Sequence, residues 1–278
     1  MILTQQQLHD ALVERHGTEI QKKLDGATVG IAGLGGLGSN LAVFLARLGI
    51  GHMILVDFDV VDITNLNRQH YTMKDLGVPK TLALVEQLEA INPYLNYETY
   101  TERVIPANVK RLFSECDVIV EAFDKPDQKA MLIENVLTQL PDKPLVSGSG
   151  MAGYGSANLI RTEKRFGHLY LCGDGKSDVA DGLGLMAPRV AVCSAHVLSM
   201  PLRFLGNSQK TVWLEVQLRT IAMDCWANIE HQLKYKQNIP DQALLLQELK
   251  RCADEITSTD LSLQTIRDLI EHHEEEPI

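Results

Sequence analysis

The chain has 278 residues, which is enough for one large domain or two modest ones, each with a buried core. Apolar residues make up 45% of the sequence and charged residues 22%, as is ordinary for a soluble globular protein. No apolar run could span a membrane, no signal peptide is evident, and a net charge of −10 disfavours nucleic acid as the main partner. We therefore expect a protein that acts on neither membranes nor nucleic acids.

Five cysteines lie far apart in the sequence, and none belongs to a Cys-x-x-Cys pair. An odd number of scattered cysteines is typical of a reducing compartment, so we expect a cytoplasmic protein without a disulfide framework. Without paired cysteines, a zinc centre built from four thiolates is not expected either. The five are Cys116, Cys172, Cys193, Cys225 and Cys252.

After an amphipathic helical arm over residues 3–24, the sequence alternates between strand-like and helix-like patterns up to residue 147. Such βαβ alternation predicts an α/β fold of Rossmann-like type, with a mostly parallel sheet and helices on both faces. In these sheets, ligands bind at the carboxyl ends of the strands. We expect strands at residues 27–32, 52–56, 97–100, 116–122 and 145–147, and helices at 39–48, 80–91 and 131–140.

Four glycines, Gly33, Gly35, Gly36 and Gly38, separate the first expected strand from the helix that follows. Glycine allows positive φ and lets backbone N–H groups come close to a phosphate, which the positive end of the helix also attracts. The alternative is a tight strand-to-helix turn without a ligand. The turn therefore indicates a nucleotide site without naming the nucleotide.

Two acidic residues, Asp57 and Asp59, follow the second expected strand. Asp57 comes 19 residues after Gly38, close to the spacing at which a carboxylate accepts hydrogen bonds from ribose hydroxyls. The alternative is that Asp57 caps the next segment. Up to this point, the pattern also fits a dinucleotide-dependent dehydrogenase.

The next polar block distinguishes such a dehydrogenase from an enzyme that cleaves ATP to activate a carboxylate. Arg68 offers a guanidinium beside the glycine turn, Asn65 and Gln69 add amide groups, and Lys80 adds a second cation. Two cations suit a polyphosphate whose charge shifts during attack at the α-phosphorus, although either could be a solvated surface residue. Asp124, just past a buried strand, could hold Mg²⁺ through its carboxylate, with waters and phosphates completing the coordination.

These segments resemble the adenylation domain of the ubiquitin-activating superfamily. Within it, residues 1–206 are most similar to the short bacterial ThiF-type enzymes of the thiamine pathway, which adenylate a sulfur-carrier protein. The resemblance implies that ATP binds with Mg²⁺, and that the C-terminal glycine carboxylate of a small ubiquitin-like carrier, ending in Gly-Gly, attacks the α-phosphate. The matching segments begin at Gly33, Val56, Asn65, Pro79, Glu121, Ser149, Tyr170 and Gly184.

The same resemblance assigns roles to individual residues. It implies a homodimer in which an arginine of the N-terminal arm enters the partner's site, and Arg15 is the nearest candidate. The other roles are Asp57 for the ribose, Asn65 and Arg68 for the phosphates, Lys80 for the α-phosphate region, Asp124 for magnesium, and Asp59 and Gln69 in support.

Two departures from the family pattern limit the expected chemistry. Larger relatives carry a paired Cys-x-x-Cys zinc site, whereas this chain keeps only Cys172 near the first position, so zinc is not expected. Residues 175–181 lack the cysteine that many relatives use for thioester or persulfide chemistry. The reaction is therefore expected to stop at adenylation. The alternative is a nucleotide-binding scaffold without catalytic activity.

Residues 207–278 form a different segment, expected to be a strand followed by helices. Residues 208–278 carry 13 acidic and 7 basic side chains, and 211–276 resemble the C-terminal part of small RelA/SpoT-type alarmone synthetases. Glu215 would match an active-site glutamate of that family. The family's basic ATP-binding residues and metal-binding aspartate have no counterpart here. A GTP pyrophosphokinase fusion is thus the weaker alternative to a mainly helical appendage.

Overall fold

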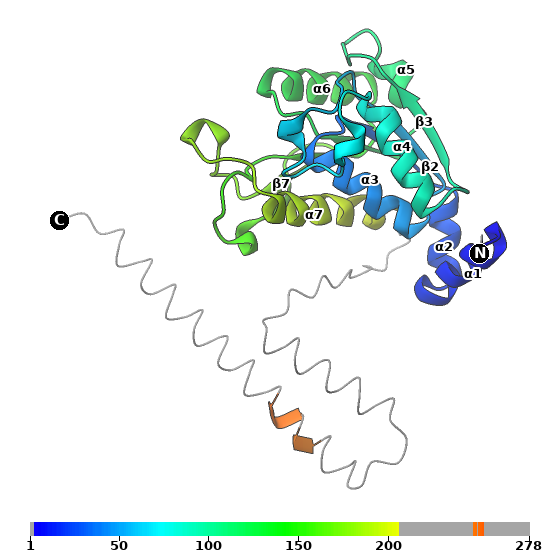
Figure 1. The fold of residues 1–278 in the computed structure, drawn as a ribbon. Helices are drawn as coiled ribbons and strands as arrows, with labels where there is room; N and C mark the ends of the chain where they lie inside the picture. The colour runs from blue at the N-terminus through cyan, green and yellow to red at the C-terminus, as the bar shows by residue number, and fades with distance from the viewer. Residues whose placement is uncertain (1–2, 206–246, 249, 253–278) are drawn as a thin grey trace. The chain divides into compact units, whose positions relative to one another are not determined.

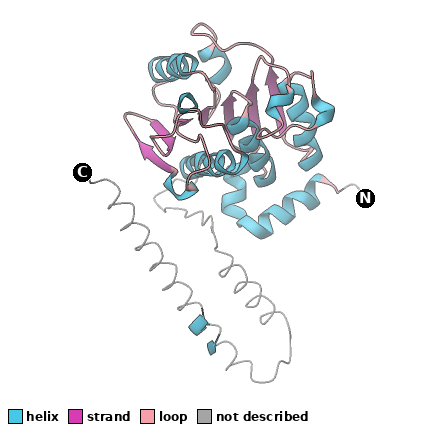
Figure 2. Cartoon of the chain, turned by 60° about the vertical axis from the view of Figure 1, so that its left-hand side comes forward, coloured by secondary structure: helices cyan, strands magenta, loops and turns pink. Residues whose placement is uncertain are grey.

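The computed structural model describes residues 3–205, 247, 248 and 250–252. The described chain forms an α/β fold around one seven-stranded sheet (Figures 1 and 2). The strands are β1 (Thr28–Ala32), β2 (His52–Val56), β3 (Asn96–Tyr100), β4 (Val118–Glu121), β5 (Leu145–Gly148), β6 (Arg161–Lys164) and β7 (Leu169–Gly173). The α-helices are α1 (Gln5–His16), α2 (Thr18–Asp25), α3 (Gly36–Leu48), α4 (Lys80–Ile91), α5 (Val109–Phe113), α6 (Pro126–Gln139) and α7 (Ala187–Leu205).

The strands follow the order β3-β2-β1-β4-β5-β7-β6 across the sheet. All neighbouring pairs are parallel except β6 and β7, which confirms the predicted Rossmann-like, mostly parallel sheet. The chain runs outward from β1 to β3 and then returns to place β4 on the other side of β1. The carboxyl ends of β1 and β4 are therefore the switch point at which such sheets bind ligands.

Alternate side chains along the inner strands face opposite layers of the molecule, as the pleat of a strand requires. Val29 and Ile31 of β1 pack in the core beneath α3, α4 and α7, whereas Ala32 belongs to the core beneath α5 and α6. Met53 and Ile54 of β2 divide in the same way. Figure 1 shows the corresponding layers, with α5 and α6 above the sheet and α3 and α7 below it.

Three local features differ from the expectations. The arm over residues 3–24 is two helices because the chain turns at Gly17, whose φ is +83°. Helix α6 begins at Pro126 and not at residue 131 as expected. Proline is favoured in the first turn of a helix because the N–H that it lacks would have no hydrogen-bond partner there. Helices α5 and α7 and strands β6 and β7 were not expected, and neither was the antiparallel pairing of β6 with β7.

The predicted boundary at residues 206/207, the expected strand at 212–219 and most of the helices expected after it lie outside the described residues, whereas residues 247, 248 and 250–252 are helical. The mainly helical appendage therefore stays a prediction. Among the described helices, none is both long and apolar enough to span a bilayer.

Candidate active site

The glycine turn joins β1 to α3 at the switch point of the sheet. Gly33 has φ of +94°, and its N–H donates to the Val56 carbonyl at 2.8 Å. A Cβ at Gly33 would lie 2.8 Å from the Ala122 carbonyl oxygen, and one at Gly38 would overlap the Gly33 carbonyl oxygen. Both positions thus need glycine, because the turn passes close to its neighbours. Helix α3 then begins at Gly36, with its N-terminal N–H groups beside this turn.

Asp57, Asp59 and Lys80 form a compact charged group beside the turn. Asp57 is 7% exposed and accepts hydrogen bonds from the Leu34 N–H at 2.7 Å and the Asp59 N–H at 2.8 Å. The Lys80 ammonium lies 3.3 Å from a carboxylate oxygen of Asp59 and 4.0 Å from one of Asp57. Burial raises the pKa of Asp57, while Lys80 and the two backbone N–H groups act in the opposite direction.

Arg68 and Gln69 lie over the glycines. The Arg68 Cγ is 3.4 Å from where a Cβ on Gly36 would stand, and the Gln69 Nε2 is 3.8 Å from the same position on Gly35. Arg68 donates to the Thr64 carbonyl at 3.0 Å, yet its buried Nε has no partner in the described structure. The Gln69 Oε1 is likewise buried without a partner there. Unpaired buried polar atoms are costly, so these two indicate a place for a polar ligand.

Asn65 lies in the same segment but makes local contacts. Its Oδ1 accepts from the Asp62 N–H at 3.0 Å, and its carbonyl accepts from the N–H groups of Arg68 and Gln69. Asn65 therefore shapes the turn that carries Arg68 and Gln69. The predicted phosphate contact of Asn65 itself stays a prediction.

Asp124 lies just beyond the carboxyl end of β4. Its side chain is exposed and has no hydrogen bond or ion pair with any described residue. The loop that carries it adjoins the glycine turn, because the Phe123 Cδ1 and the Ala122 carbonyl both lie within 3.0 Å of the position of a Cβ on Gly33. A free carboxylate beside a glycine turn suited to phosphate could take Mg²⁺, which binds one or two carboxylates and keeps several waters.

Arg15 is the one predicted site residue that lies far from the glycine turn. It is exposed in the last turn of α1, and Leu12 of the same helix packs against Gly49 at the C-terminal end of α3. Helix α3 has 13 residues and is about 20 Å long, so Arg15 lies far from the glycine turn of its own chain.

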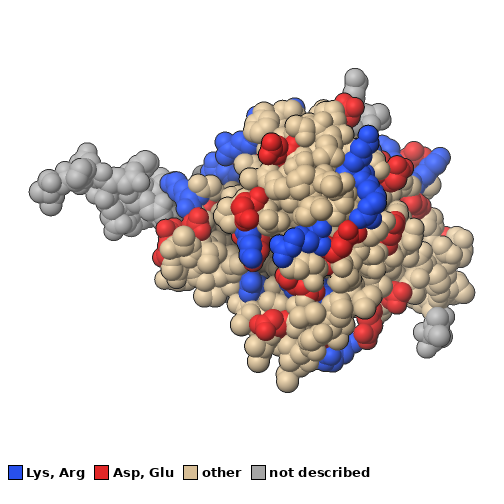
Figure 3. Space-filling model, turned by 90° about the horizontal axis from the view of Figure 1, so that it is seen from above, with Lys and Arg blue, Asp and Glu red and all other residues tan. Residues whose placement is uncertain are grey.

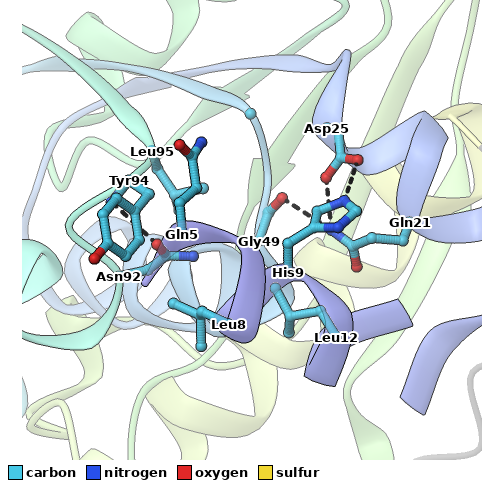
Figure 4. A pocket seen from close by; sticks show the side chains of 11 residues that line it. Gln5, Leu8, His9, Leu12, Gln21, Asp25, Gly49, Asn92, Tyr94 and Leu95 are labelled. Atoms are coloured by element: carbon cyan, nitrogen blue, oxygen red, sulfur yellow. Dashed lines mark hydrogen bonds and ion pairs between the residues drawn. The ribbon is translucent and has the colours of Figure 1, made fainter. Parts of the chain in front are cut away.

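A cavity of about 320 Å³ lies at this same end of α3 (Figure 4). His9 and Asp25 meet beside it at 2.8 Å, and Gln21 donates to Asp25 at 2.8 Å. Its other lining residues are Gln5, Leu8, Leu12, Gly49, Gly51, Asn92, Tyr94 and Leu95. Since it is at the opposite end of α3 from the glycine turn, this cavity is no part of the candidate site.

Two groups of residues support the site without having been predicted. The Tyr71 hydroxyl donates to the Leu34 carbonyl at 2.8 Å and so stabilises the glycine turn. Glu121, fully buried at the end of β4, pairs with Lys129 at 2.8 Å. Neither group has a sequence signal of its own, although Tyr71 follows closely after Gln69 and Glu121 precedes Asp124 by three residues.

The cysteines and charges add two further observations. Cys116, Cys172 and Cys193 are buried, and no group of three or more His, Cys, Asp or Glu side chains in the described parts of the chain could hold a metal. Basic and acidic side chains lie close together across the face shown in Figure 3, without a continuous field of either sign.

The fold and this arrangement define a Rossmann-like α/β protein with a charged site at the switch point of its sheet. Residues 7–237, most of the chain, match the sequence model of the ThiF family. The chain belongs to the ThiF family.

Several known proteins are similar to parts of this chain. The adenylyltransferase and sulfurtransferase UBA4 of Eremothecium gossypii is 39% identical over 161 residues, which cover 57% of this chain and 35% of UBA4. The sulfur carrier protein adenylyltransferase of Thermus thermophilus is 35% identical over 134 residues, covering 48% of this chain and 49% of that protein. The chain thus spans half or less of these relatives.

Among solved structures, the E. coli tRNA N6-threonylcarbamoyladenosine dehydratase TcdA, in complex with ATP, shares the fold. Its TM-score is 0.66 at 23% identity, over 74% of this chain and 97% of that one.

Proposed function

We propose that this chain uses ATP to adenylate the C-terminal carboxylate of a small ubiquitin-like sulfur-carrier protein. A carboxylate oxygen of the carrier forms a bond to the α-phosphorus, and the bond from that phosphorus to the oxygen bridging to the β-phosphate breaks. The products are the carrier acyl-adenylate and pyrophosphate. The names of the relatives support this reaction class, since both the UBA4 and the Thermus proteins are called adenylyltransferases.

The observation that carries the proposal is the group of polar residues around the glycine turn. Asp57, Arg68 and Gln69 approach the turn from two separate segments, and Arg68 and Gln69 each leave a buried polar atom without a described partner. A nucleotide phosphate would supply an acceptor for the Arg68 Nε. Each oxygen of Asp57 accepts one backbone N–H and keeps a lone pair for a ribose hydroxyl.

The proposed chemistry is mainly electrostatic. Arg68 and Lys80 would stabilise the charge that develops on the phosphates as pyrophosphate leaves, and Lys80 would exchange its contact with Asp59 for one with phosphate. Mg²⁺ held by Asp124 would neutralise phosphate charge and orient the leaving group. The backbone N–H groups at the start of α3 would bind a phosphate directly.

Finer parts of the proposal rest on the sequence resemblance alone. These are a carrier of the thiamine pathway with a Gly-Gly end and a homodimer in which Arg15 reaches the partner's site. A cytoplasmic location rests instead on the odd number and scattered positions of the cysteines. The names of the relatives do not separate a thiamine-pathway carrier from other carriers.

The decisive test is exchange of labelled pyrophosphate into ATP, with and without a Gly-Gly-ended carrier. We expect exchange only with the carrier, and a fall of about a hundredfold in Asp124→Ala, the scale of loss when one electrostatic contact to a transition state is removed. Asp127→Ala is the matched control, because Asp127 is an exposed carboxylate three residues away in the first turn of α6.

Three outcomes would contradict adenylation of a carrier. Exchange that is equal in Asp124→Ala and wild type removes the assigned site, and exchange without any carrier removes the assigned substrate. ATP binding with exchange at background under all conditions would favour the scaffold alternative.

A further inference from the structure

A buried carboxylate lies directly behind the loop that carries Asp124. Glu121 is fully buried at the end of β4 and accepts four hydrogen bonds. One oxygen accepts from the Phe123 N–H at 2.7 Å, and the other accepts from the Ser147 hydroxyl at 2.5 Å. Both oxygens also accept from the Lys129 ammonium.

Lys129 uses all of its donors within this cluster. Its ammonium donates to the two Glu121 oxygens at 3.1 and 2.8 Å and to the Gly148 carbonyl at 2.8 Å. An ammonium has three N–H bonds, so none is left for a phosphate. Lys129 is therefore not a third cation of the nucleotide site, despite its position on α6 near Asp124.

The cluster joins three elements at the switch point. Glu121 ends β4, Ser147 and Gly148 end the neighbouring strand β5, and Lys129 lies on α6, the helix that follows the Asp124 loop. The hydrogen bond to the Phe123 N–H fixes the backbone one residue before Asp124. Asp124 has no described partner of its own, so its place depends on the backbone of this loop.

We propose that the Glu121–Lys129 pair is a positioning device that holds the Asp124 carboxylate where it meets the metal of a bound metal–nucleotide complex. This inference rests on the proposed function, because it takes Asp124 as the metal ligand. Glu121 and Lys129 touch neither nucleotide nor metal and act only through the loop. Groups that orient a metal ligand in this way typically change metal affinity by about 10- to 100-fold when removed.

The test compares Lys129→Met with Lys129→Arg in the full chain. Mn²⁺ replaces Mg²⁺, and electron paramagnetic resonance reports how tightly the protein binds the Mn²⁺–ATP complex. We expect Lys129→Met to bind Mn²⁺–ATP about tenfold more weakly, and Lys129→Arg to stay near wild type because a guanidinium can still donate to Glu121. Binding of metal-free ATP, followed by calorimetry, is expected to be unchanged in both variants.

Two further variants separate positioning from folding. Lys74→Met is the matched control, because Lys74 pairs with Glu86 at 2.7 Å on the surface. Lys129→Met leaves Glu121 as an uncompensated buried charge, so it is accompanied by Glu121→Met/Lys129→Met, in which apolar chains replace the pair. This double variant is expected to melt as one cooperative transition and to bind Mn²⁺–ATP as weakly as Lys129→Met.

The outcomes distinguish this inference from the proposed function. Wild-type affinity for Mn²⁺–ATP in the folded double variant overturns the positioning role, whatever the exchange assay gives. An equal loss of metal-free ATP binding also overturns it, since that result indicates general damage to the site. If wild type binds Mn²⁺–ATP but shows no exchange, the proposed adenylation fails while the positioning role is still decided by the variants. If wild type binds no Mn²⁺–ATP, both are wrong.

Discussion

Asp57 is buried, yet its proposed role at the ribose requires the ionised carboxylate. Burial raises its pKa above the ordinary value of 3.8, which means that the folded chain favours the protonated carboxyl. This group therefore contributes stability below its ordinary pKa and loses that contribution as the pH rises through the raised value. At neutral pH, the ionised carboxylate lowers stability, yet it is the form with free lone pairs for two ribose hydroxyls.

The nucleoside affinity is accordingly expected to depend on pH. As the pH falls through the raised pKa of Asp57, protonation removes an acceptor, so the affinity for adenosine should begin to fall while the pH is still above 3.8. Adenosine is preferable to ATP because phosphate groups titrate near pH 6. Calorimetry from about pH 8 down to about pH 4 checks this, with Asp127→Asn as the control. A flat profile in wild type, or the same slope in Asp57→Asn, would contradict the assignment.

The buried cysteines are expected to be poor nucleophiles. Burial raises the pKa of Cys172 to about 11 and that of Cys116 and Cys193 to about 12. At pH 8, very little thiolate is present, and each sulfur is covered, so iodoacetamide should alkylate them far more slowly in native protein than in urea. Peptide mass spectrometry measures each rate, with the partly exposed Cys252 as internal reference. Fast native alkylation of Cys172 would reopen sulfur chemistry in this chain.

At the scale of elements, the close passage of β1, the glycine turn and α3 determines which substitutions the turn tolerates. A Cβ at Gly38 would overlap the Gly33 carbonyl oxygen and lie 3.1 Å from Ile31 Cγ2. We expect Gly38→Ala to lower the free energy of unfolding by about 3 kcal/mol, the upper range for overpacking. Urea denaturation measures this. Gly26→Ala is the control, since a Cβ there would lie 3.8 Å from the Lys22 carbonyl oxygen, an ordinary contact, and equal stability of both variants would refute the steric argument.

Several elements with a strong apolar pattern were predictable from the sequence, although β7 and α7, which are also rich in apolar residues, were missed. The strand at 52–56 and the helix at 80–91 have the expected bounds, because buried parallel strands are continuous apolar runs and a proline precedes the helix. Strand β6 was missed, since its residues Arg-Thr-Glu-Lys have no apolar face and it forms only by pairing with β7. The division of the arm at Gly17 depends on a positive φ that the helical pattern on either side conceals.

The candidate site was predictable to the same physical extent. That Gly33 and Asp57 meet could be predicted because strand ends and a helix start must converge at one edge of a parallel sheet, while the roles of these residues and of Arg68 toward ATP stay predictions. The pairing of Glu121 with Lys129 could not, because it depends on how α6 returns over the end of β4. The position of Arg15, at the far end of α3, likewise follows from packing of the arm.

At the scale of the whole molecule, the two hydrophobic cores found among the described residues are built from residues between Leu24 and Met200. A chain that ends after residue 206 is therefore expected to fold cooperatively and to keep carrier-dependent pyrophosphate exchange within about twofold of the full chain. Thermal melting and the exchange assay check this. Loss of folding in the shorter chain would show that the adenylation domain does not end at residue 206.

The tail offers a second test of the whole chain. We expect no pyrophosphorylated guanine nucleotide when the full protein is mixed with ATP and GDP or GTP. The reason is that the residues before 211 contain no counterpart of the basic ATP-binding residues of alarmone synthetases. Thin-layer or anion-exchange separation of the nucleotides detects the product. Its formation would support the GTP pyrophosphokinase alternative.

The antiparallel strand β6 also affects how the protein behaves in a concentrated solution. It is the strand at one edge of the sheet, where unpaired backbone N–H and C=O groups could pair with strands of other molecules. Its exposed residues include Arg161, Glu163 and Lys164, and charges along an edge oppose the stacking of further strands. The strand with the weakest sequence signal thus carries charges that oppose self-association at this edge, and we expect the proposed ubiquitin-like partner to dock by side-chain contacts rather than by extending the sheet here.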